Sequence, residues 1–203
     1  MEFSDAVRAR RMVRTYTGEP VDAATLTGLL AAATRAPSAG NTQGWDFLVL
    51  REPDDRDAFW AATTDPDATP DRWLTGMRTA PVLVLCLSDR DRYLDRYAEP
   101  DKGWTDRDPD RWPVPYWDVD VGMAAMILLL GAVDAGLAAA FFGVPPDHAD
   151  AVHQALGIPP GRRIVGVVSV GHSAPDRRSP SLARGRRPLA EVVHDGRFGV
   201  PWA

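Results

Sequence analysis

The chain has 203 residues, of which 45% are hydrophobic, and this length and composition fit one globular domain with a sizeable core. Its formal net charge of −5 argues against nucleic acid or an anionic membrane as a partner. Cys86 is the only cysteine, which excludes a disulfide within the chain and fits a reducing, cytoplasmic location.

The first predicted element is a short helix from Asp5 to Arg11, with Ser4 or Asp5 as its N-cap. No apolar run follows its first basic residues, so no signal peptide is expected. Four arginines fall within seven positions at the end of this helix: Arg8, Arg10, Arg11 and Arg14. Only one or two of these arginines are needed to interact favourably with the partial negative charge at the C-terminus of the helix. They predict a local anion site if the fold or a dimer brings them to the arginines near the C-terminus.

A second helix is predicted from Asp22 to Arg35, because apolar residues recur along one helical face. These residues are Leu26, Leu29, Leu30 and Ala33. Asp22 is the expected N-cap, and Pro37 ends the helix.

The loop that follows, from Pro37 to Trp45, leads into a predicted strand from Asp46 to Leu50. Within it, Ser38, Asn41 and Gln43 carry hydroxyl and amide groups that can face the polar edge of a heterocycle. The same residue types also build ordinary surface turns. From the residues alone, a ligand loop and a plain turn therefore remain alternatives.

The middle of the chain combines predicted core elements with a long aromatic stretch. Residues 51–80 are expected to form one or two helices with loops, and residues 81–87 a buried strand. Residues 89–117 contain these large aromatic side chains: Tyr93, Tyr97, Trp104, Trp112, Tyr116 and Trp117. So long an irregular segment is usually functional or disordered, and this density of aromatics disfavours disorder. We predict a lid over the ligand site, with surface packing or a dimer contact as the alternative.

Residues 121–144 are apolar except for Asp134 and are long enough to cross a membrane. In a membrane span Asp134 would lie in the hydrocarbon, and Gly136 is a natural helix stop. A buried helix from Trp117 to Ala135 is therefore favoured, followed by a strand from Ala138 to Val144.

The last part of the chain is predicted to hold one more helix, one more strand and an arm. The helix opens at Pro145–Pro146, where proline suits the first turn, and it ends near Gly157. A core strand spans residues 164–171, and residues 173–203 form an extended arm. No metal site is expected, because the histidines show no ligand spacing with carboxylates or the cysteine. The histidines are His148, His153, His172 and His194.

Together these motifs resemble the nitroreductase family of FMN-dependent oxidoreductases. One matching set lies in the arginine-rich segment after the first helix and in the loop before the first strand: Arg10, Arg14, Tyr16, Pro37, Ser38, Asn41, Gln43 and Trp45. A second set lies in the central helix: Asp120, Ala124, Leu130, Ala132 and Gly136. The strand end at residues 142–144, the last core strand, the basic segment 184–189 and the tail 193–198 complete the pattern. Met12, Gly44 and Ile127 depart from it, because the family usually has Ser, Pro and Asn there.

The resemblance implies a single α+β domain over residues 1–203, with three layers and a mostly antiparallel central sheet flanked by helices. It also implies a homodimer whose core includes the helix 117–135. The residues that would hold FMN are Arg10, Arg11, Met12, Arg14, Pro37, Ser38, Ala39, Asn41, Gln43, Phe142, Gly143, Val144, Arg184 and Arg186. Among them, Arg10, Arg184 and Arg186 would bind the phosphate. Arg14 would approach the ribityl chain or the pyrimidine edge of the ring.

The activity implied by the resemblance is hydride transfer from NADH or NADPH through FMN to a flat acceptor such as a nitroaromatic, a quinone or an enone. The chemistry would take place on flavin N5 without a catalytic side chain. Trp104, Trp112 and Tyr116 of the aromatic stretch would contact the acceptor. Two alternatives stay open: a protein that stores or senses flavin without turnover, and a flavoenzyme that uses a deazaflavin donor or oxygen as acceptor.

Overall fold

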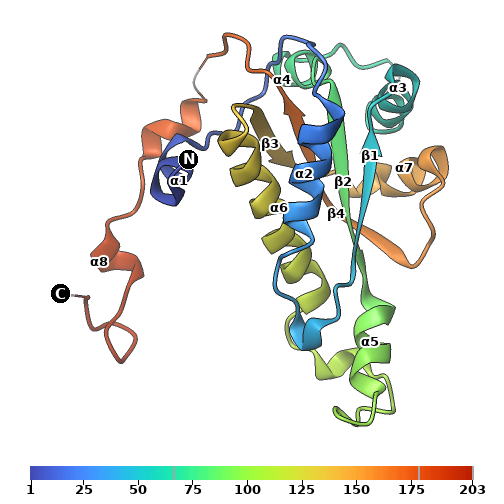
Figure 1. Ribbon diagram of the computed structural model, residues 1–203, viewed down its shortest axis with the longest axis vertical. Coiled ribbons are helices and arrows are strands. Elements are labelled where there is room, and N and C mark those ends of the chain that lie inside the picture. The colour runs from blue at the N-terminus through green and yellow to red at the C-terminus, as the bar shows by residue number, and fades with distance from the viewer. Residues whose placement is uncertain (66, 178, 203) are drawn as a thin grey trace.

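A four-stranded antiparallel sheet in the order β1-β2-β4-β3 forms the centre of the structure (Figure 1). The computed structural model describes residues 1–65, 67–177 and 179–202. The strands are β1 (Trp45–Leu50), β2 (Val82–Asp89), β3 (Ala138–Phe142) and β4 (Arg162–Gly171). Pro66 belongs to the predicted segment 51–80, and Arg178 and Ala203 belong to the predicted arm 173–203; all three lie outside the described residues.

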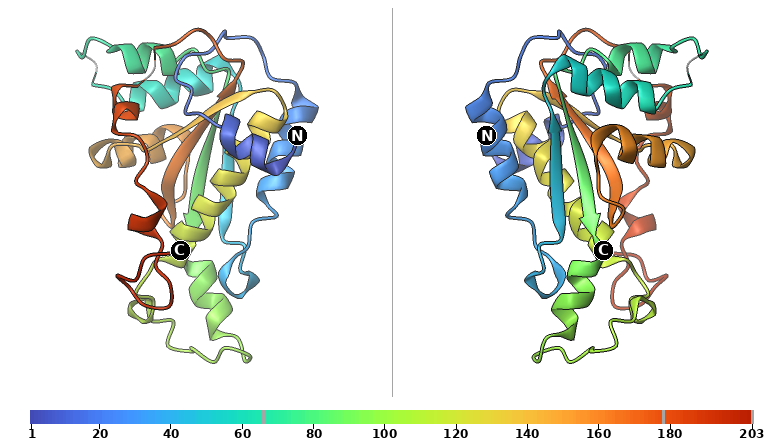
Figure 2. Two further views of the ribbon diagram at one scale, coloured as in Figure 1. Left: turned by 90° about the vertical axis from the view of Figure 1, so that its left-hand side faces the viewer. Right: turned by 90° about the vertical axis from the view of Figure 1, so that its right-hand side faces the viewer.

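Helices cover both faces of this sheet, which confirms the predicted three-layer α+β architecture (Figure 2). The helices α2 (Ala23–Ala33) and α6 (Tyr116–Asp134) pack on one face. On the other face lie α3 (Pro53–Ala62), α4 (Arg72–Met77) and α7 (Ala149–Leu156). Both faces are therefore shielded from water.

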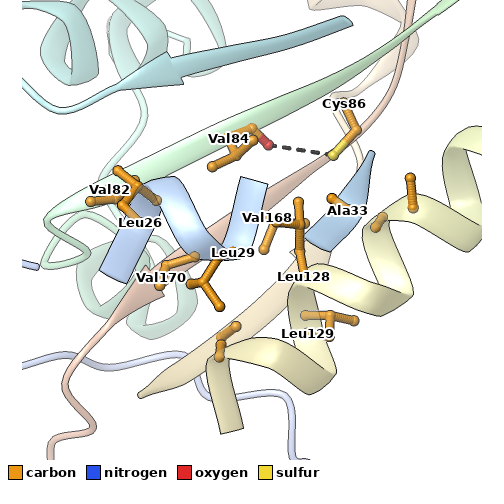
Figure 3. Close-up of a cluster of buried hydrophobic side chains, with 14 of the residues drawn as sticks. Leu26, Leu29, Ala33, Val82, Val84, Cys86, Leu128, Leu129, Val168 and Val170 are labelled. Atoms are coloured by element: carbon orange, nitrogen blue, oxygen red, sulfur yellow. Dashed lines mark hydrogen bonds between the residues drawn. The ribbon is translucent and has the colours of Figure 1, made fainter. Parts of the chain in front are cut away.

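Burial on both faces of the sheet explains why the sequence of strand β2 is a nearly continuous apolar run. All of its residues are buried, and successive side chains point to opposite faces. Val82, Val84 and Cys86 join the cluster under α2 and α6 (Figure 3), whereas the alternating leucines join the cluster under α3 and α7. Burial raises the pKa of the Cys86 thiol to about 12, so this cysteine is an inert core residue.

Helix α6 is a core element, as predicted. Its length and composition alone would allow a membrane span. However, it packs against the sheet and α2, and its buried residues are Trp117, Asp120, Val121, Ala124, Ala125, Leu128, Leu129 and Ala132. The predicted N-cap of α2 is also confirmed, because the Asp22 carboxylate accepts a 2.8 Å hydrogen bond from the Thr25 N–H.

The predicted bounds of the first helix and of the strand after α6 were wrong, and one helix was not predicted. The first helix, α1, spans Phe3–Ala9 with Glu2 at its N-cap, so Ser4 and Asp5 lie inside its first turn. Strand β3 ends at Phe142, and the next two residues form part of the loop toward α7. The aromatic stretch opens with a regular helix, α5 (Arg90–Ala98), because Asp89 caps it by accepting from the Arg92 N–H at 3.2 Å.

Short helical turns complete the chain. Single turns of 3-10 helix are η1 (Ala39–Asn41), η2 (Pro109–Arg111) and η3 (Pro146–His148). The C-terminal arm holds η4 (Pro180–Arg184) and α8 (Leu189–Val192). Figure 1 shows α8 and the C-terminal end of this arm standing away from the sheet.

Candidate functional site

The loop at residues 37–43, here called the amide loop, has a strained and internally bonded backbone. Asn41 and Gln43 both have a φ of +53°, a left-handed conformation that is uncommon outside glycine. The Ser38 hydroxyl oxygen accepts a 2.9 Å hydrogen bond from the Gln43 N–H. Asn41 and Gln43 are nevertheless exposed. Such conformations persist only where the surrounding structure fixes them, so the loop has a defined shape that presents two amides outward.

A buried carboxylate fixes that shape from behind. Asp120 of α6 is 1% exposed, and its Oδ2 atom accepts from the Ala39 N–H at 2.8 Å and from the Tyr93 hydroxyl at 2.7 Å. Burial and the bond to Asp120 both raise the pKa of Tyr93, so Tyr93 stays a protonated donor. From α5, Arg96 Nε also donates to the Gly40 carbonyl at 3.0 Å. The helices α5 and α6 thus hold the amide loop together.

The glycine at position 44 follows from the same packing. A Cβ atom built there would lie 2.4 Å from Cε2 of the Tyr93 ring, which is far inside van der Waals contact. A proline, the usual residue of the family at this position, would collide with the ring in the same way. Gly44 is therefore matched to Tyr93, and this departure from the family pattern has a steric cause.

The basic turn, residues 10–14, lies on the outer edge of β3. Met12 forms a parallel bridge with Ala139, and the Val13 N–H donates to the Ala139 carbonyl at 3.1 Å. The Met12 sulfur lies 3.4 Å from the Phe141 nitrogen. Met12 therefore anchors the turn to β3, a different task from the hydroxyl donor that the family usually has here.

The arginines of the basic turn have few partners. Nη1 of Arg10 is buried and has no hydrogen-bond partner among the described residues, Arg11 is exposed, and Arg14 donates to the Met12 carbonyl at 3.3 Å. A buried guanidinium nitrogen without an acceptor is rare in folded proteins. Guanidinium binds phosphate and carboxylate with paired donors. Arg10 is therefore suited to bind an anionic ligand that is not part of this chain.

Tyr16 closes the basic turn against the sheet. Its hydroxyl donates to the Val13 carbonyl at 2.8 Å and lies 2.7 Å from Ser169 Oγ of β4. Burial raises the pKa of Tyr16 to about 12, although the contact with Ser169 and the charge of Arg14 oppose the shift.

Within one chain the basic turn and the amide loop lie at opposite corners of the sheet (Figure 1). Met12 lies beside Ala139 of β3. Across the sheet, Ala139 pairs with Val170 of β4, and Val170 pairs with Val82 at the N-terminal end of β2. Trp45, just after the amide loop, pairs with Ser88 at the other end of β2. At about 3.3 Å per residue these levels are about 20 Å apart, and β1 and β3 are opposite edges of the sheet. The structure therefore does not bring the two halves of the predicted cofactor site together.

Two adjoining cavities lie beside β3 and α4. One, of about 330 Å³, is lined by Phe142, Gly143 and the aromatic residues of α3 and α4. The other, of about 280 Å³, is lined by Arg14, Arg72 and Arg177 among others. Trp73 borders both. Of the predicted site residues, Phe142, Gly143 and Arg14 are thus gathered on one side of the molecule, and the partly buried Val144 packs against the core cluster under α3 and α7.

The remaining predicted residues lie elsewhere. Arg184 and Arg186 are exposed on the C-terminal arm, and neither forms a salt bridge within the part of the chain that the structure describes. Trp112 lies at the centre of an aromatic cluster, whose other rings are those of Tyr93, Tyr97, Trp104, Tyr116 and Trp117. This cluster rests on α5. Two residues of the aromatic stretch, Tyr93 and Arg96, also support the amide loop.

Sequence reasoning missed the contacts that shape the site. Asp120 was noted only as a match in the central helix, although a carboxylate in an apolar helix signals a buried hydrogen-bonding task. Tyr93 was assigned to a lid, whereas it holds the amide loop in place. Trp60 and Trp73 carried no motif, and only the folded structure brings them to Phe142.

Comparison with known proteins gives a consistent result. A family model described as the nitroreductase family matches residues 7–172. A protein of Archaeoglobus fulgidus named as an NADH dehydrogenase/NAD(P)H nitroreductase is 27% identical over 168 residues, which is 82% of each chain. An iodotyrosine deiodinase of Nematostella vectensis is 22% identical over 95% of this chain and 74% of its own.

A solved structure shares the fold over almost the whole chain. It comes from Desulfovibrio desulfuricans and is described as a nitroreductase in complex with FMN. It is 27% identical, has a TM-score of 0.70, and the match covers 98% of both chains.

Proposed function

The chain belongs to the nitroreductase family, and from that premise we propose that it is an FMN-dependent oxidoreductase. It takes hydride from NADH or NADPH and passes it to a flat acceptor such as a nitroaromatic, a quinone or an enone. The observation that carries the proposal is the buried Nη1 atom of Arg10 on the basic turn, which has no partner in the part of the chain that the structure describes. The FMN complex of the Desulfovibrio desulfuricans relative supports the choice of cofactor.

The residues present fit FMN. Arg10, with Arg184 and Arg186 of the arm, would bind the phosphate through charge-assisted hydrogen bonds. Arg14 would face the ring and stabilise negative charge that develops there on reduction. Met12 offers no hydroxyl to the phosphate, so the arginines and backbone N–H groups carry that contact. When bound, the flavin supplies the redox chemistry, and the protein binds, orients and shields it.

The amide loop would supply the second half of the site. Asn41 and Gln43 present exposed amides in a fixed backbone, and amides can both donate to and accept from the carbonyls and ring nitrogens of a flavin. The Ala39 N–H is already committed to Asp120, so Ala39 and Pro37 would shape the loop without contacting the ring through hydrogen bonds. The loop therefore recognises the ring by shape and by two side chains.

Because the two halves are separated within one chain, we propose a homodimer in which each flavin site combines the basic turn of one copy with the amide loop of the other. Apolar surface supports this proposal. On α6, Val119 is 41% and Met126 45% exposed. The C-terminal arm adds further exposed apolar residues, namely Leu182, Leu189, Val192, Phe198, Val200 and Trp202. A second copy of the chain would cover these side chains.

The visible spectrum of the purified protein tests the proposal. We expect a yellow protein that releases FMN on denaturation and is bleached by NADH or NADPH, with reoxidation by a quinone or a nitroaromatic. A yellow protein that neither nucleotide bleaches would instead fit flavin storage, or a flavoenzyme with a deazaflavin donor or oxygen as acceptor. A colourless protein that takes up no FMN would contradict the cofactor. We place the enzyme in the cytoplasm.

A further inference from the structure

The smaller of the two cavities beside β3 and α4 carries an excess of positive charge. Its volume is about 280 Å³, and the charged residues of its lining are Arg14, Arg72, Arg177 and Asp176. Three guanidinium groups thus stand against one carboxylate, in a chain whose formal net charge is −5. A hollow lined mostly by one sign of charge concentrates the electric field. This cavity therefore favours negative charge on whatever enters it.

Backbone pairing holds the start of the C-terminal arm against the basic turn. The Thr17 N–H donates to the His172 carbonyl, and the Ala174 N–H donates to the Thr15 carbonyl, both at 3.0 Å. The residues that follow the basic turn therefore run beside the residues that begin the arm. Asp176 comes two residues after the last of these bonds, so the pairing fixes where its carboxylate enters the cavity lining.

An ion pair joins this part of the arm to α4. Nη2 of Arg72 donates to Oδ1 of Asp176 at 2.7 Å. The Arg72 side chain is 61% exposed, and that of Asp176 is 23% exposed. Ion pairs as exposed as this one contribute little to stability, because water and salt screen them. The pair nevertheless places one positive and one negative group beside the cavity that Arg14 also lines.

The proposed flavin contacts are divided between the two adjoining cavities. Phe142 and Gly143 line the larger one. Arg14, which would face the ring and stabilise the negative charge that develops on reduction, lines the smaller one. Trp73 borders both cavities. The charge of the reduced flavin would therefore meet the residues of the smaller cavity, where Arg72 provides a second guanidinium.

We propose that Arg72 is a further cofactor contact that stabilises the reduced flavin, and that Asp176 is a positioning residue that holds Arg72 and offsets its charge. Both roles rest on the proposed function. A guanidinium is permanently charged, so Arg72 attracts negative charge on the ring and favours reduced over oxidised flavin. The Asp176 carboxylate repels the same charge and so limits this preference. The ion pair thus sets how readily the bound flavin is reduced.

The midpoint potential of bound FMN tests the pair, because it reports the ratio of the affinities for oxidised and reduced FMN. Arg72→Gln should weaken the binding of reduced FMN about 3- to 10-fold more than that of oxidised FMN, which lowers a two-electron potential by about 15 to 30 mV. Asp176→Asn should shift the potential in the opposite direction, because it removes a negative charge. The double variant should lie close to the wild type.

Two further variants are the controls. Arg72→Lys keeps the positive charge and should lie closer to the wild type than Arg72→Gln does. Arg107→Gln breaks another exposed ion pair, in which Arg107 lies 2.8 Å from Asp95, and should leave the potential unchanged. Urea unfolding curves of all variants, measured without flavin, should nearly overlay, since exposed ion pairs contribute little to stability.

Shifts of Arg72→Gln and Asp176→Asn in the same direction would overturn the proposal, because loss of local structure, and not charge, would then explain them. So would FMN-loaded variants whose potentials equal that of the wild type. In that case the proposed function would stand without this pair. A wild-type chain that takes up no FMN would instead contradict the proposed function, and the roles of Arg72 and Asp176 with it.

Discussion

The amide loop and the basic turn are built in opposite ways. Contacts within the same chain fix the amide loop. Asp120 accepts from its backbone, Arg96 donates to one of its carbonyls, and the Tyr93 ring fills the space beside the adjacent Gly44. The backbone of the basic turn is likewise anchored on β3, but among its arginines only Arg14 has a side-chain contact described above, and Nη1 of Arg10 is buried without a partner among the described residues. The loop is thus held in shape by its own chain, whereas the proposed flavin phosphate would complete the contacts of the turn.

This difference suggests that the amide loop and the basic turn have different roles in ligand binding. A preorganised loop contributes shape and orientation, since its strain is already balanced by α5 and α6. The arginines of the turn would contribute charge, and the buried Nη1 atom of Arg10, which has no partner among the described residues, would gain one when an anion binds. The comparison therefore predicts that damage to the loop destabilises the fold, whereas damage to the turn weakens cofactor binding and leaves the fold intact.

The largest effect should follow from Asp120→Ala. The change leaves the Tyr93 hydroxyl and the Ala39 N–H buried without an acceptor, at a cost of about 3 to 4 kcal/mol in the free energy of unfolding. Urea denaturation of the wild type and the variant measures it. Asp134→Asn, on the exposed end of the same helix, is the control and should change stability little. A loss no larger than that of the control would mean that the loop is held by other contacts.

The arginines should show the reverse pattern. Arg10→Ala and Arg186→Ala should each weaken FMN binding by about 1.5 to 3 kcal/mol, the value of one charge-assisted hydrogen bond. Their unfolding curves, measured without flavin, should overlay that of the wild type. Arg14→Ala should also make the bound flavin harder to reduce, which a redox titration detects. Unchanged FMN affinity in all three variants would remove the arginines from the site.

A smaller effect is expected at Gly44. A methyl group at this position collides with the Tyr93 ring, so Gly44→Ala should lower stability by about 1 to 2 kcal/mol. Gly28→Ala is at an exposed position of α2, where the added carbon meets no described atom within 4 Å apart from the adjoining residues and the backbone of its own helix. It should leave stability unchanged or raise it slightly. If both variants behave alike in thermal unfolding, the close contact between Gly44 and Tyr93 is not what shapes the loop.

The last effect is absent at neutral pH and appears only in alkali. The pKa of Tyr16 rises from 10.0 to about 12 on folding, so the unfolded chain loses this proton first. The contribution to stability is fully present below pH 10 and is lost as the pH rises toward 12. Tyr16→Phe removes the titrating group, so its free energy of unfolding should fall less steeply across this window. Parallel slopes for the wild type and the variant would contradict the assignment.

Much of the fold was predictable because local chemistry determines it. Asp22 begins α2, the alternation along β2 supplies both core faces, and α6 reads as a core helix despite its apolar length. Helix α5 was missed because its charged residues look irregular in sequence. Its signal was the Asp89 cap with Tyr93, Leu94 and Tyr97 at helical spacing, a pattern that indicates one buried face.

The site was only half predictable for a different reason. Residue types identified the arginines and the amides, but their distance depends on strand order and register. Local motifs do not determine strand order or register. Met12 pairs with β3 and Trp45 pairs with Ser88, and both pairings link residues far apart in the chain.

We have proposed that each flavin site combines the basic turn of one copy with the amide loop of another. Mixed dimers test it most directly. One chain carries Arg10→Ala with Arg14→Ala, the other carries Ser38→Ala with Asn41→Ala, and differently tagged chains are coexpressed and purified together. In the mixed dimer, one of the two shared sites has both halves intact, so we predict one FMN per pair, although neither parent binds flavin. Mixed dimers as empty as the parents would contradict the claim and place each site within a single chain.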